Sequence, residues 1–574
     1  MKSYEQVIKS RLVAILEKSS YFSKFQAAYR KRRSTCDHLL AIQEIFLHYR
    51  FNKIGPRGGI GKQLLYLCFM DLKKAFDMVP SHILFAKLKS IGVDGKILNI
   101  IKDLYDNNEA VVRVGDYISD PFTIETGVMQ GSKLGPILFL IYINDLLQQL
   151  EDSKLGVNIW GIIISALGFA DDIILIADRA GNLQKLIDIC SEWSKLNGMS
   201  FNIDKCKVMP LNSRKKQHIF TIDQKILEVV KEYKYLGIIL SNSRLTSLIS
   251  KHIAHIIEKA DKRINCIKHL GFQSDGLRPE TTIEMYKILV RPILEYASQV
   301  LTYEHHYYNQ SEARPSKIQN DQLAKLEKFQ NRILKFLVPC PQSTPPALLR
   351  LLTGIVTIKG RVDTLKMRYF WRSVRQKNAH LSKIICERNR SCKIGFAHGI
   401  FKLCCKYNHL NVWLGISRPK INPVREIRRI IEEFHFKQDL QKALNTECLY
   451  TTLFLKKRTF KSKCYKMEAF LKHMGKFPDA KSRTLYLYAL LDTCKYERNC
   501  PKCGSAEKDI ISHIFSTCEK ALDLRLNLRL RLNFYGVPNT FNFKDKQAVF
   551  ELVMDRKLIY LKTLCSILKD IGPY

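Results

Sequence analysis

The sequence lacks the features expected of an exported or membrane-spanning protein. Residues 1–20 have no uninterrupted apolar core followed by a small-residue cleavage site, and their spacing predicts an amphipathic helix. The one serious candidate for a membrane span, residues 159–177, contains Asp171 and Asp172 with no basic residue beside them, which argues against insertion. The 17 cysteines are odd in number and scattered, so we expect reduced intracellular thiols and not a secreted disulfide framework.

Acidic residues are also scarce. The chain has 54 Asp and Glu against 93 Lys and Arg, a formal charge of +39, while 46% hydrophobic residues exclude a disordered basic tail. A fixed positive charge of this size attracts polyanions and gains affinity by releasing their counterions. Nucleic acid is therefore the expected partner, ahead of an anionic membrane surface. Internal repeats and low-complexity segments are absent from the sequence.

Local patterns divide the chain into a mixed N-terminal part and a helical remainder. In the first part, helices are predicted over 36–51, 81–106, 136–150 and 183–193, and strands over 64–70, 110–126, 233–240 and on both sides of Ala170-Asp171-Asp172. Beyond residue 243, long helices are predicted over 248–268, 279–304 and 317–337, and residues 350–495 have weaker helical patterns.

Three aspartates stand at the ends of predicted strands. Asp71 ends the apolar run 64–70, and Asp171 with Asp172 lies at a hairpin tip. Turn chemistry alone explains such residues, but converging carboxylates also hold divalent metal ions. Two such ions about 4 Å apart clamp the attacking and departing oxygens of a phosphoryl transfer. Neighbouring motifs have to decide between these interpretations.

Three motifs occur in a fixed order: FMDLKKAFDMV around Asp71, GVMQGSKLGPILFLIYINDL around Gln130 and GFADDIILIA around Asp171. Together they resemble reverse transcriptases, most closely those of non-LTR (LINE-like, Jockey-type) retrotransposons. The resemblance covers about residues 20–242 and includes FQAAYRKRRSTCDHL at 25–39, GMSFNIDKCKVM at 198–209 and YLGIIL at 235–240. It implies an α+β right-hand polymerase with fingers, a palm with an antiparallel sheet, and a helical thumb.

The resemblance also implies a role for each matching residue in the chemistry. Asp71 and Asp171 are expected to bind two Mg²⁺ ions, or Mn²⁺, with Asp172 adjacent and supporting. Lys205 is expected to protonate the departing pyrophosphate, with Lys207 as an alternative that the sequence does not separate.

Further residues are implied in substrate binding. Phe76 would lie under the nucleotide sugar and exclude a 2′-hydroxyl, unless it is an ordinary core residue. Gln130 and Gly131 would contact the incoming base and template. The remaining expectations are a triphosphate grip by Arg30 with Lys31 and Arg33, a primer grip by Tyr235, Leu236 and Gly237, and a structural role for Asp77. By itself, the run RKRR is more typical of a solvated basic patch or an import signal.

A second candidate site lies near the C-terminus. Cys500, Cys503, His513 and Cys518 form the pattern C-x2-C-x9-H-x4-C, whose four ligands can close a structural zinc site. Chance pairs among many cysteines are the alternative, but similar Cys/His modules follow the polymerase in many non-LTR elements. The run KKRTFKSKCYK at 456–466 fits a solvated helix face and a phosphate-tracking surface equally well.

The resemblance therefore implies an RNA-directed DNA polymerase; the usual substrate of this family is the element's own transcript, primed at a nicked chromosomal site. Its partners would be an RNA template, a DNA primer or target and dNTPs, with no membrane, in a ribonucleoprotein of nucleus and cytoplasm. The expected domains are fingers and palm (1–242), thumb (243–345), helical C-terminal region (346–495), zinc knuckle (496–520) and helical tail (521–574).

Two rival hypotheses keep this fold: a nucleic-acid-binding derivative that no longer polymerises, and a group II intron-type maturase. Because the fingers motif lies close to Met1, we expect either a fragment of a longer reading frame or nicking by another protein. An acidic cluster with a lysine, as a downstream nuclease would need, is not evident in the C-terminal sequence.

Overall fold

The computed structural model describes residues 2–51, 64–106, 108–159, 161–212, 218–242, 245–268, 279–301, 317–338, 340, 343–376, 380–392, 395–415 and 423–446, and short pieces of 498–526. These residues belong to two compact units. Unit 1 comprises Met1–His252, Val300–Ala313 and Phe370–Ile400, and unit 2 comprises Ile253–Gln299, Arg314–Tyr369 and Phe401–Tyr574. Over the described ranges, no helix combines the length and apolarity needed to cross a bilayer.

A five-stranded sheet forms the core of unit 1. Its order is β13 (Glu228–Val229), β10 (Lys207–Leu211), β1 (Leu65–Met70), β9 (Asp172–Ala177) and β8 (Ala166–Phe169). All neighbouring pairs are antiparallel except β10 with β13. Every residue of β1 is buried, which explains why its sequence is apolar without alternation. The predicted mixed fold with a largely antiparallel sheet is confirmed in this unit.

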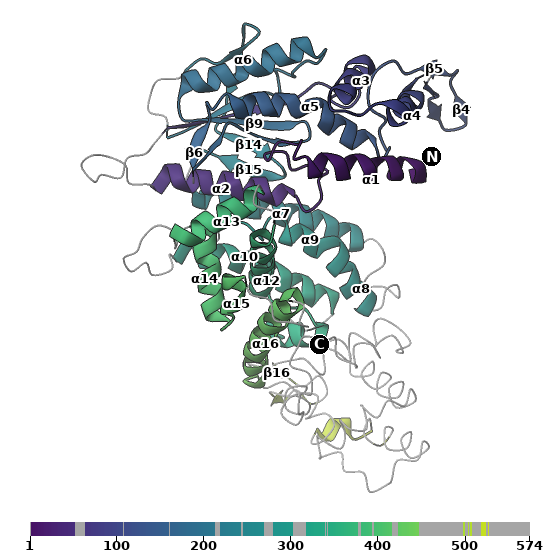
Figure 1. Cartoon of the computed structure of the whole chain (residues 1–574). Coiled ribbons are helices and arrows are strands. Elements are labelled where there is room, and N and C mark those ends of the chain that lie inside the picture. The colour runs from purple at the N-terminus through teal and green to yellow at the C-terminus, as the bar shows by residue number, and fades with distance from the viewer. Residues whose placement is uncertain are drawn as a thin grey trace, which may run out of the picture. The chain divides into compact units, whose positions relative to one another are not determined.

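Two helices pack on this sheet (Figure 1). They are α5 (Gly135–Asp152), which contacts β8, and α6 (Ala180–Leu196), which contacts β1 and β9. Residues 137–143 of α5 are buried without exception, as expected for a helix that is apolar nearly all round. The sheet and these helices bring the ends of β1 and β9 to one edge of a rigid core.

The other elements of unit 1 mostly follow the predicted ranges. They are α1 (Lys2–Lys18), α2 (Thr35–Phe51), α3 (Ser81–Ser90), α4 (Gly95–Tyr105), β2 (Glu109–Ala110), β3 (Arg113–Val114), β4 (Tyr117–Ile118), β5 (Phe122–Thr123), β6 (Val157–Ile159), β7 (Ile162–Ile164), β11 (Thr221–Ile222), β12 (Lys225–Ile226), β14 (Glu232–Tyr235), β15 (Ile238–Ser241) and α13 (Leu381–Cys392). The prediction of one helix over 81–106 was wrong. The structure has two helices there, because Gly92 follows α3 with a φ of +81°, in the left-handed region where helices commonly end.

Unit 2 is helical where it is described. Its elements are α8 (Pro279–Met285), a π turn (Tyr286–Val290), α9 (Arg291–Glu295), α10 (Lys317–Leu337), α11 (Pro346–Thr353), α15 (Leu410–Leu414) and α16 (Pro423–Leu444), and parts of α7 (Leu245–Lys268), α12 (Ile358–Val374) and α14 (Gly395–Lys406). The helix predicted over 279–304 instead ends at Glu295. A π turn interrupts it just before Pro292, which lacks the backbone N–H that an unbroken helix uses.

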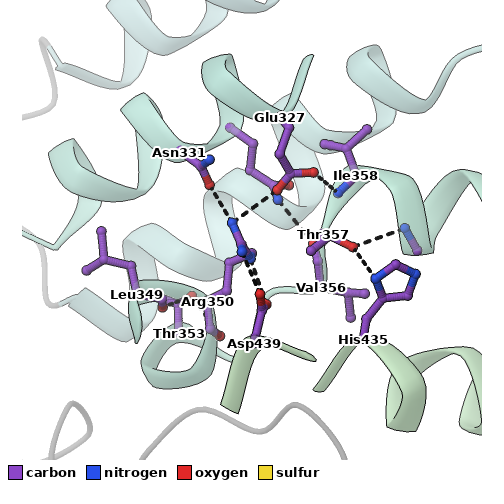
Figure 2. Close-up of polar contacts among 12 residues, drawn as sticks. Glu327, Asn331, Leu349, Arg350, Thr353, Val356, Thr357, Ile358, His435 and Asp439 are labelled. Atoms are coloured by element: carbon purple, nitrogen blue, oxygen red, sulfur yellow. Dashed lines mark hydrogen bonds and ion pairs between the residues drawn. The ribbon is translucent and has the colours of Figure 1, made fainter. Parts of the chain in front are cut away.

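A buried polar network joins the helices of unit 2 (Figure 2). The guanidinium of Arg350 donates to both carboxylate oxygens of Asp439 at 2.8 and 2.6 Å, and to Asn331 at 2.9 Å. It also donates to Glu327 at 3.2 Å, whose second oxygen accepts the N–H of Ile358 at 2.7 Å. Removing one partner would leave a buried charge uncompensated, so the network fixes how α10, α11, α12 and α16 pack.

Candidate active site at the ends of the central strands

Strand register brings the three aspartates together. Met70 pairs with Ile173 across β1 and β9, so Asp71 and Asp172 stand at the same end of neighbouring strands. Asp172 also pairs with Phe169 of β8, which places Asp171 in the tight turn between β8 and β9. The charges of Asp71 and Asp171 both act on Asp172, although residues 71 and 171 are a hundred positions apart.

The site concentrates negative charge. Burial, reinforced by the carboxylates of Asp171 and Asp71, raises the pKa of Asp172 to about 6. Burial also raises the pKa of Asp171; its own backbone amide opposes the shift and Asp71 adds to it. The Oδ2 atom of Asp71 is buried and accepts no hydrogen bond in the described structure. Its ion-pair partner is the Nζ atom of Lys205 at 3.3 Å.

These carboxylates suit a hard divalent cation. A cation would offset both the burial and the mutual repulsion that raise the pKa values of Asp172 and Asp171, and would give Oδ2 of Asp71 a ligand besides its ion pair with Lys205. Among the residues whose placement is described, no three or more His, Cys, Asp or Glu side chains already form a coordination shell. Asp71 and Asp171, with Asp172 beside them, are the residues that would hold such an ion.

The structure separates the two lysines that the sequence left as alternatives. Lys205 faces Asp71, and its side chain is 65% exposed. Lys207 instead forms an ion pair with Glu228, at 2.6 Å between Nζ and Oε2, which lies on the neighbouring strand β13. Of the two, Lys205 is therefore the cation at the candidate site.

Phe76 lies beside the acidic cluster. Its half-buried ring stacks on Phe139 of α5 with centroids 4.5 Å apart, and meets the edge of Tyr29 at 6.4 Å. The hydroxyl pKa of Tyr29 is raised by burial and by the charge of Asp171, so these aromatic rings border the carboxylates. The role of Phe76 under a nucleotide sugar stays a prediction.

The loop that carries Gln130 is tied to the segment that follows Asp71. The exposed Gln130 donates through Nε2 to Oδ1 of Asp77 at 2.7 Å. The N–H of Val128 donates to the carbonyl of Phe76 at 2.7 Å, while Gly131 adopts φ +83°. Sequence reasoning treated Asp77 as merely structural and missed that it holds Gln130, because no spacing pattern links residues 77 and 130.

Comparison with known protein families identifies this region. Residues 1–240 match the family described as Reverse transcriptase (RNA-dependent DNA polymerase). Over these residues the chain is similar to a reverse transcriptase domain. The motif-based resemblance to non-LTR retrotransposon enzymes is confirmed, since curated proteins of such elements are among the relatives of this chain.

Three relatives illustrate the likeness. The RNA-directed DNA polymerase from mobile element jockey of Drosophila funebris is 29% identical over 52% of this chain and 32% of its own length. The Pol polyprotein of retrotransposable element R2DM of Drosophila melanogaster is 28% identical, over 30% of this chain and 17% of its own. The probable RNA-directed DNA polymerase from transposon X-element of Drosophila melanogaster is 24% identical over 66% of this chain and 38% of its own length. The chain thus spans about a third or less of the jockey and R2DM proteins.

Solved structures give a weaker likeness. Telomerase from Candida tropicalis, solved with a fragment of telomeric RNA, is 13% identical and aligns with a TM-score of 0.32. The alignment covers 69% of this chain and 56% of the telomerase chain.

The guanidinium of Arg30 already has hydrogen-bond partners within the protein. It donates to both carboxylate oxygens of Glu17 at 2.7 and 2.8 Å, and to the carbonyls of Ser23 and Gln26 at 2.7 and 3.2 Å. The side chain is only 4% exposed. A triphosphate contact by Arg30 would require the ion pair with Glu17 to open, and that role stays a prediction.

The predicted primer grip is a hairpin of unit 1. Leu236 and Gly237 connect β14 to β15, and both have positive φ, +43° and +78°, as a type I′ turn requires. Tyr235 is buried, and its hydroxyl lies 3.3 Å from Nδ1 of His38. Tyr233 stacks on Phe69 at 3.9 Å, and burial, with Asp172 and Asp71, raises its pKa to about 12. The hairpin therefore adjoins the acidic cluster.

The predicted zinc knuckle lies largely outside the described residues. Cys500 and His513 are not described, nor is the basic run 456–466. Cys503 is described, with its Sγ atom 2.9 Å from Oγ of Ser505, and Cys518 is buried. Two short strands, β16 (Arg498–Asn499) and β17 (Ala506–Glu507), pair antiparallel on either side of the segment that contains Cys500 and Cys503.

Proposed function

We propose that this chain is an RNA-directed DNA polymerase of a non-LTR retrotransposon. It would add deoxynucleotides to a primer 3′-hydroxyl on an RNA template. The observation that carries the proposal is the convergence of Asp71, Asp171 and Asp172 at adjacent strand ends inside the region that is similar to a reverse transcriptase domain. The names of the jockey and X-element relatives describe the same activity for those longer proteins.

The residues of the site have distinct tasks in this reaction. Asp71 and Asp171 would hold the magnesium ions, and bound ions would supply charge neutralisation at the phosphates and a lower pKa of the primer hydroxyl. With a pKa of about 6, Asp172 itself is mostly ionised at neutral pH. Lys205, next to Asp71, can give a proton to the departing pyrophosphate. Phe76 excludes a ribose 2′-hydroxyl, and Asp77 orients Gln130 toward the base.

The same proposal covers the rest of the chain. Residues 243–345 would form the thumb and residues 346–495 a helical extension, in line with the helices described in these ranges. Cys500, Cys503, His513 and Cys518 would bind a structural zinc ion, because four such ligands at the spacing C-x2-C-x9-H-x4-C can close a tetrahedral site; the strand pair β16–β17 flanks the C-x2-C segment. Metal analysis of the purified chain should find one zinc ion, lost in a Cys503→Ser, Cys518→Ser variant.

Nucleic acid and dNTPs are the proposed partners. A charge of +39 favours an RNA template and a DNA primer through their phosphates, and a nuclear and cytoplasmic ribonucleoprotein would follow. Binding of this kind weakens steeply with salt.

Primer extension tests the central proposal. With poly(rA)/oligo(dT), dTTP and Mg²⁺, the wild-type chain should incorporate nucleotide, and Asp171→Asn should lower the rate at least about a thousandfold. Asp188→Asn on α6, whose exposed carboxylate accepts only a local hydrogen bond from Gln184, is the matched control and should keep full activity.

Two results would contradict the proposal. The first is tight binding of the primer-template by the wild type without incorporation, which would indicate a binding protein. The second is undiminished incorporation by Asp171→Asn. Binding measured by fluorescence anisotropy in every variant distinguishes a lost catalytic group from a lost fold.

A further inference from the structure

Ala170, directly before Asp171, has an unfavourable backbone conformation. Its φ is +57°, in the left-handed region that costs a residue with a Cβ atom roughly 1 kcal/mol or more. The residue is 5% exposed, so its backbone N–H and C=O have little access to water. The conformation of Ala170 sets the direction in which the chain continues from β8 to Asp171. Other groups in the protein must therefore stabilise this turn.

One side chain serves both backbone polar groups of Ala170. Oε1 of Gln26 accepts the N–H of Ala170 at 3.0 Å, and Nε2 of Gln26 donates to the carbonyl of Ala170 at 3.5 Å. Oε1 also accepts the N–H of Ala28 at 3.0 Å, which fixes the amide within its own loop. Gln26 is 1% exposed, so these contacts are shielded from water.

The surrounding backbone holds Gln26 against β8. The N–H of Ala27 donates to the carbonyl of Gly168 at 3.1 Å, and the N–H of Gly168 donates to the carbonyl of Phe25 at 3.0 Å. A Cβ atom on Gly168 would lie 2.9 Å from Leu147 Cδ1 and 3.3 Å from Nε2 of Gln26. The glycine therefore permits the close approach of the amide to the turn.

We propose that Gln26 is a positioning residue for the candidate active site. It does not touch substrate; it completes the hydrogen bonds of the left-handed turn at Ala170 and so fixes the position of Asp171. An amide suits this task because it offers a donor and an acceptor, as a strand partner would. This inference rests on the proposed polymerase function.

Kinetics of the full chain test the inference. Gln26→Ala should lower kcat about ten- to a hundredfold, the cost of one or two lost buried hydrogen bonds at the reacting centre, while KM for dTTP and primer-template affinity stay within about twofold. Adding Ala170→Gly should restore about half of the lost activity on a logarithmic scale, because glycine adopts positive φ without steric cost. Gln148→Ala is the control, since its exposed amide donates to the carbonyl of Tyr21 at 3.1 Å and should not affect kcat.

Amide hydrogen exchange gives a readout that does not depend on activity. Gln26→Ala should speed exchange in a peptide covering residues 165–175 and leave the α6 peptide unchanged. Unchanged kcat, or faster exchange throughout unit 1 without rescue by Ala170→Gly, would overturn the positioning role. If the wild type itself does not polymerise, the proposed function fails, whereas exchange at 165–175 still decides whether Gln26 holds the turn.

Discussion

Among single residues, the two lysines near the acidic cluster differ by their partners. Lys205 faces Asp71 at 3.3 Å, and Lys207 is held by Glu228 at 2.6 Å. Lys205→Ala should therefore lower kcat about tenfold or more, as expected for loss of a general acid, while Lys207→Ala leaves it within twofold. Single-turnover incorporation measures both, and equal losses in the two variants would remove Lys205 from the mechanism.

The position of Phe76 predicts an effect on the choice between ribonucleotides and deoxynucleotides. Its ring is fixed by stacking on Phe139, so it cannot easily move aside for a 2′-hydroxyl. Phe76→Val should raise the ratio of rNTP to dNTP incorporation at least about tenfold, because removing a steric clash recovers a kcal/mol or more. Competition between rUTP and dTTP measures the ratio. Phe85→Val, at a half-buried position on α3, should leave the ratio unchanged.

Among the elements, the loop before Gln130 depends on a close approach of two backbones. A Cβ atom on Gly127 would lie 2.8 Å from the carbonyl oxygen of Asp77, and Gly127 has φ +102°. Gly127→Ala should therefore lower the free energy of unfolding by about 1–3 kcal/mol and weaken the Asp77–Gln130 contact. Gly181→Ala in α6 meets nothing within 4 Å and should not destabilise, which urea denaturation of both variants would check. Equal stability of the two variants would contradict this account of the loop.

In unit 1 as a whole, Glu44 joins distant parts of the chain. Its two oxygens accept hydrogen bonds from Nδ2 of Asn389 at 2.7 Å and from the N–H of Phe396 at 2.9 Å, 345 and 352 positions away. Burial nevertheless raises the pKa of Glu44 from 4.5 to about 7, against the effect of these donors. The folded protein thus binds this proton more tightly than the unfolded chain does.

The sign of the pH dependence follows from this shift. The contribution of Glu44 to the free energy of unfolding is fully present below about pH 4.5. It is lost as the pH rises through 7, and the total loss is up to about 3 kcal/mol. Over that range the unfolding free energy of Glu44→Gln should fall less steeply than that of the wild type. Glu192→Gln, an exposed residue of α6, should keep the wild-type slope. A slope unaltered by Glu44→Gln would refute the linkage.

The sequence by itself determined the elements and the identity of the acids. The apolar run of β1, the helical spacing of α2 and α5, and the motifs around Asp71, Gln130 and Asp171 are local patterns, and each was recognisable within about twenty residues. The interruption of helix 81–106 was missed, because helical periodicity continues across a glycine that the backbone uses as a stop.

Only the tertiary structure decided which residues meet. The register of β1 and β9 brings Asp71 against Asp172, β13 takes Lys207 away from the site, and Gln26 reaches a turn 144 positions ahead in the chain. Such contacts depend on how a whole sheet and its helices bury their apolar faces together. The local spacing of residues determines which face of a helix or strand a side chain is on. Which residue it contacts there depends on how the apolar faces of the sheet and helices pack together.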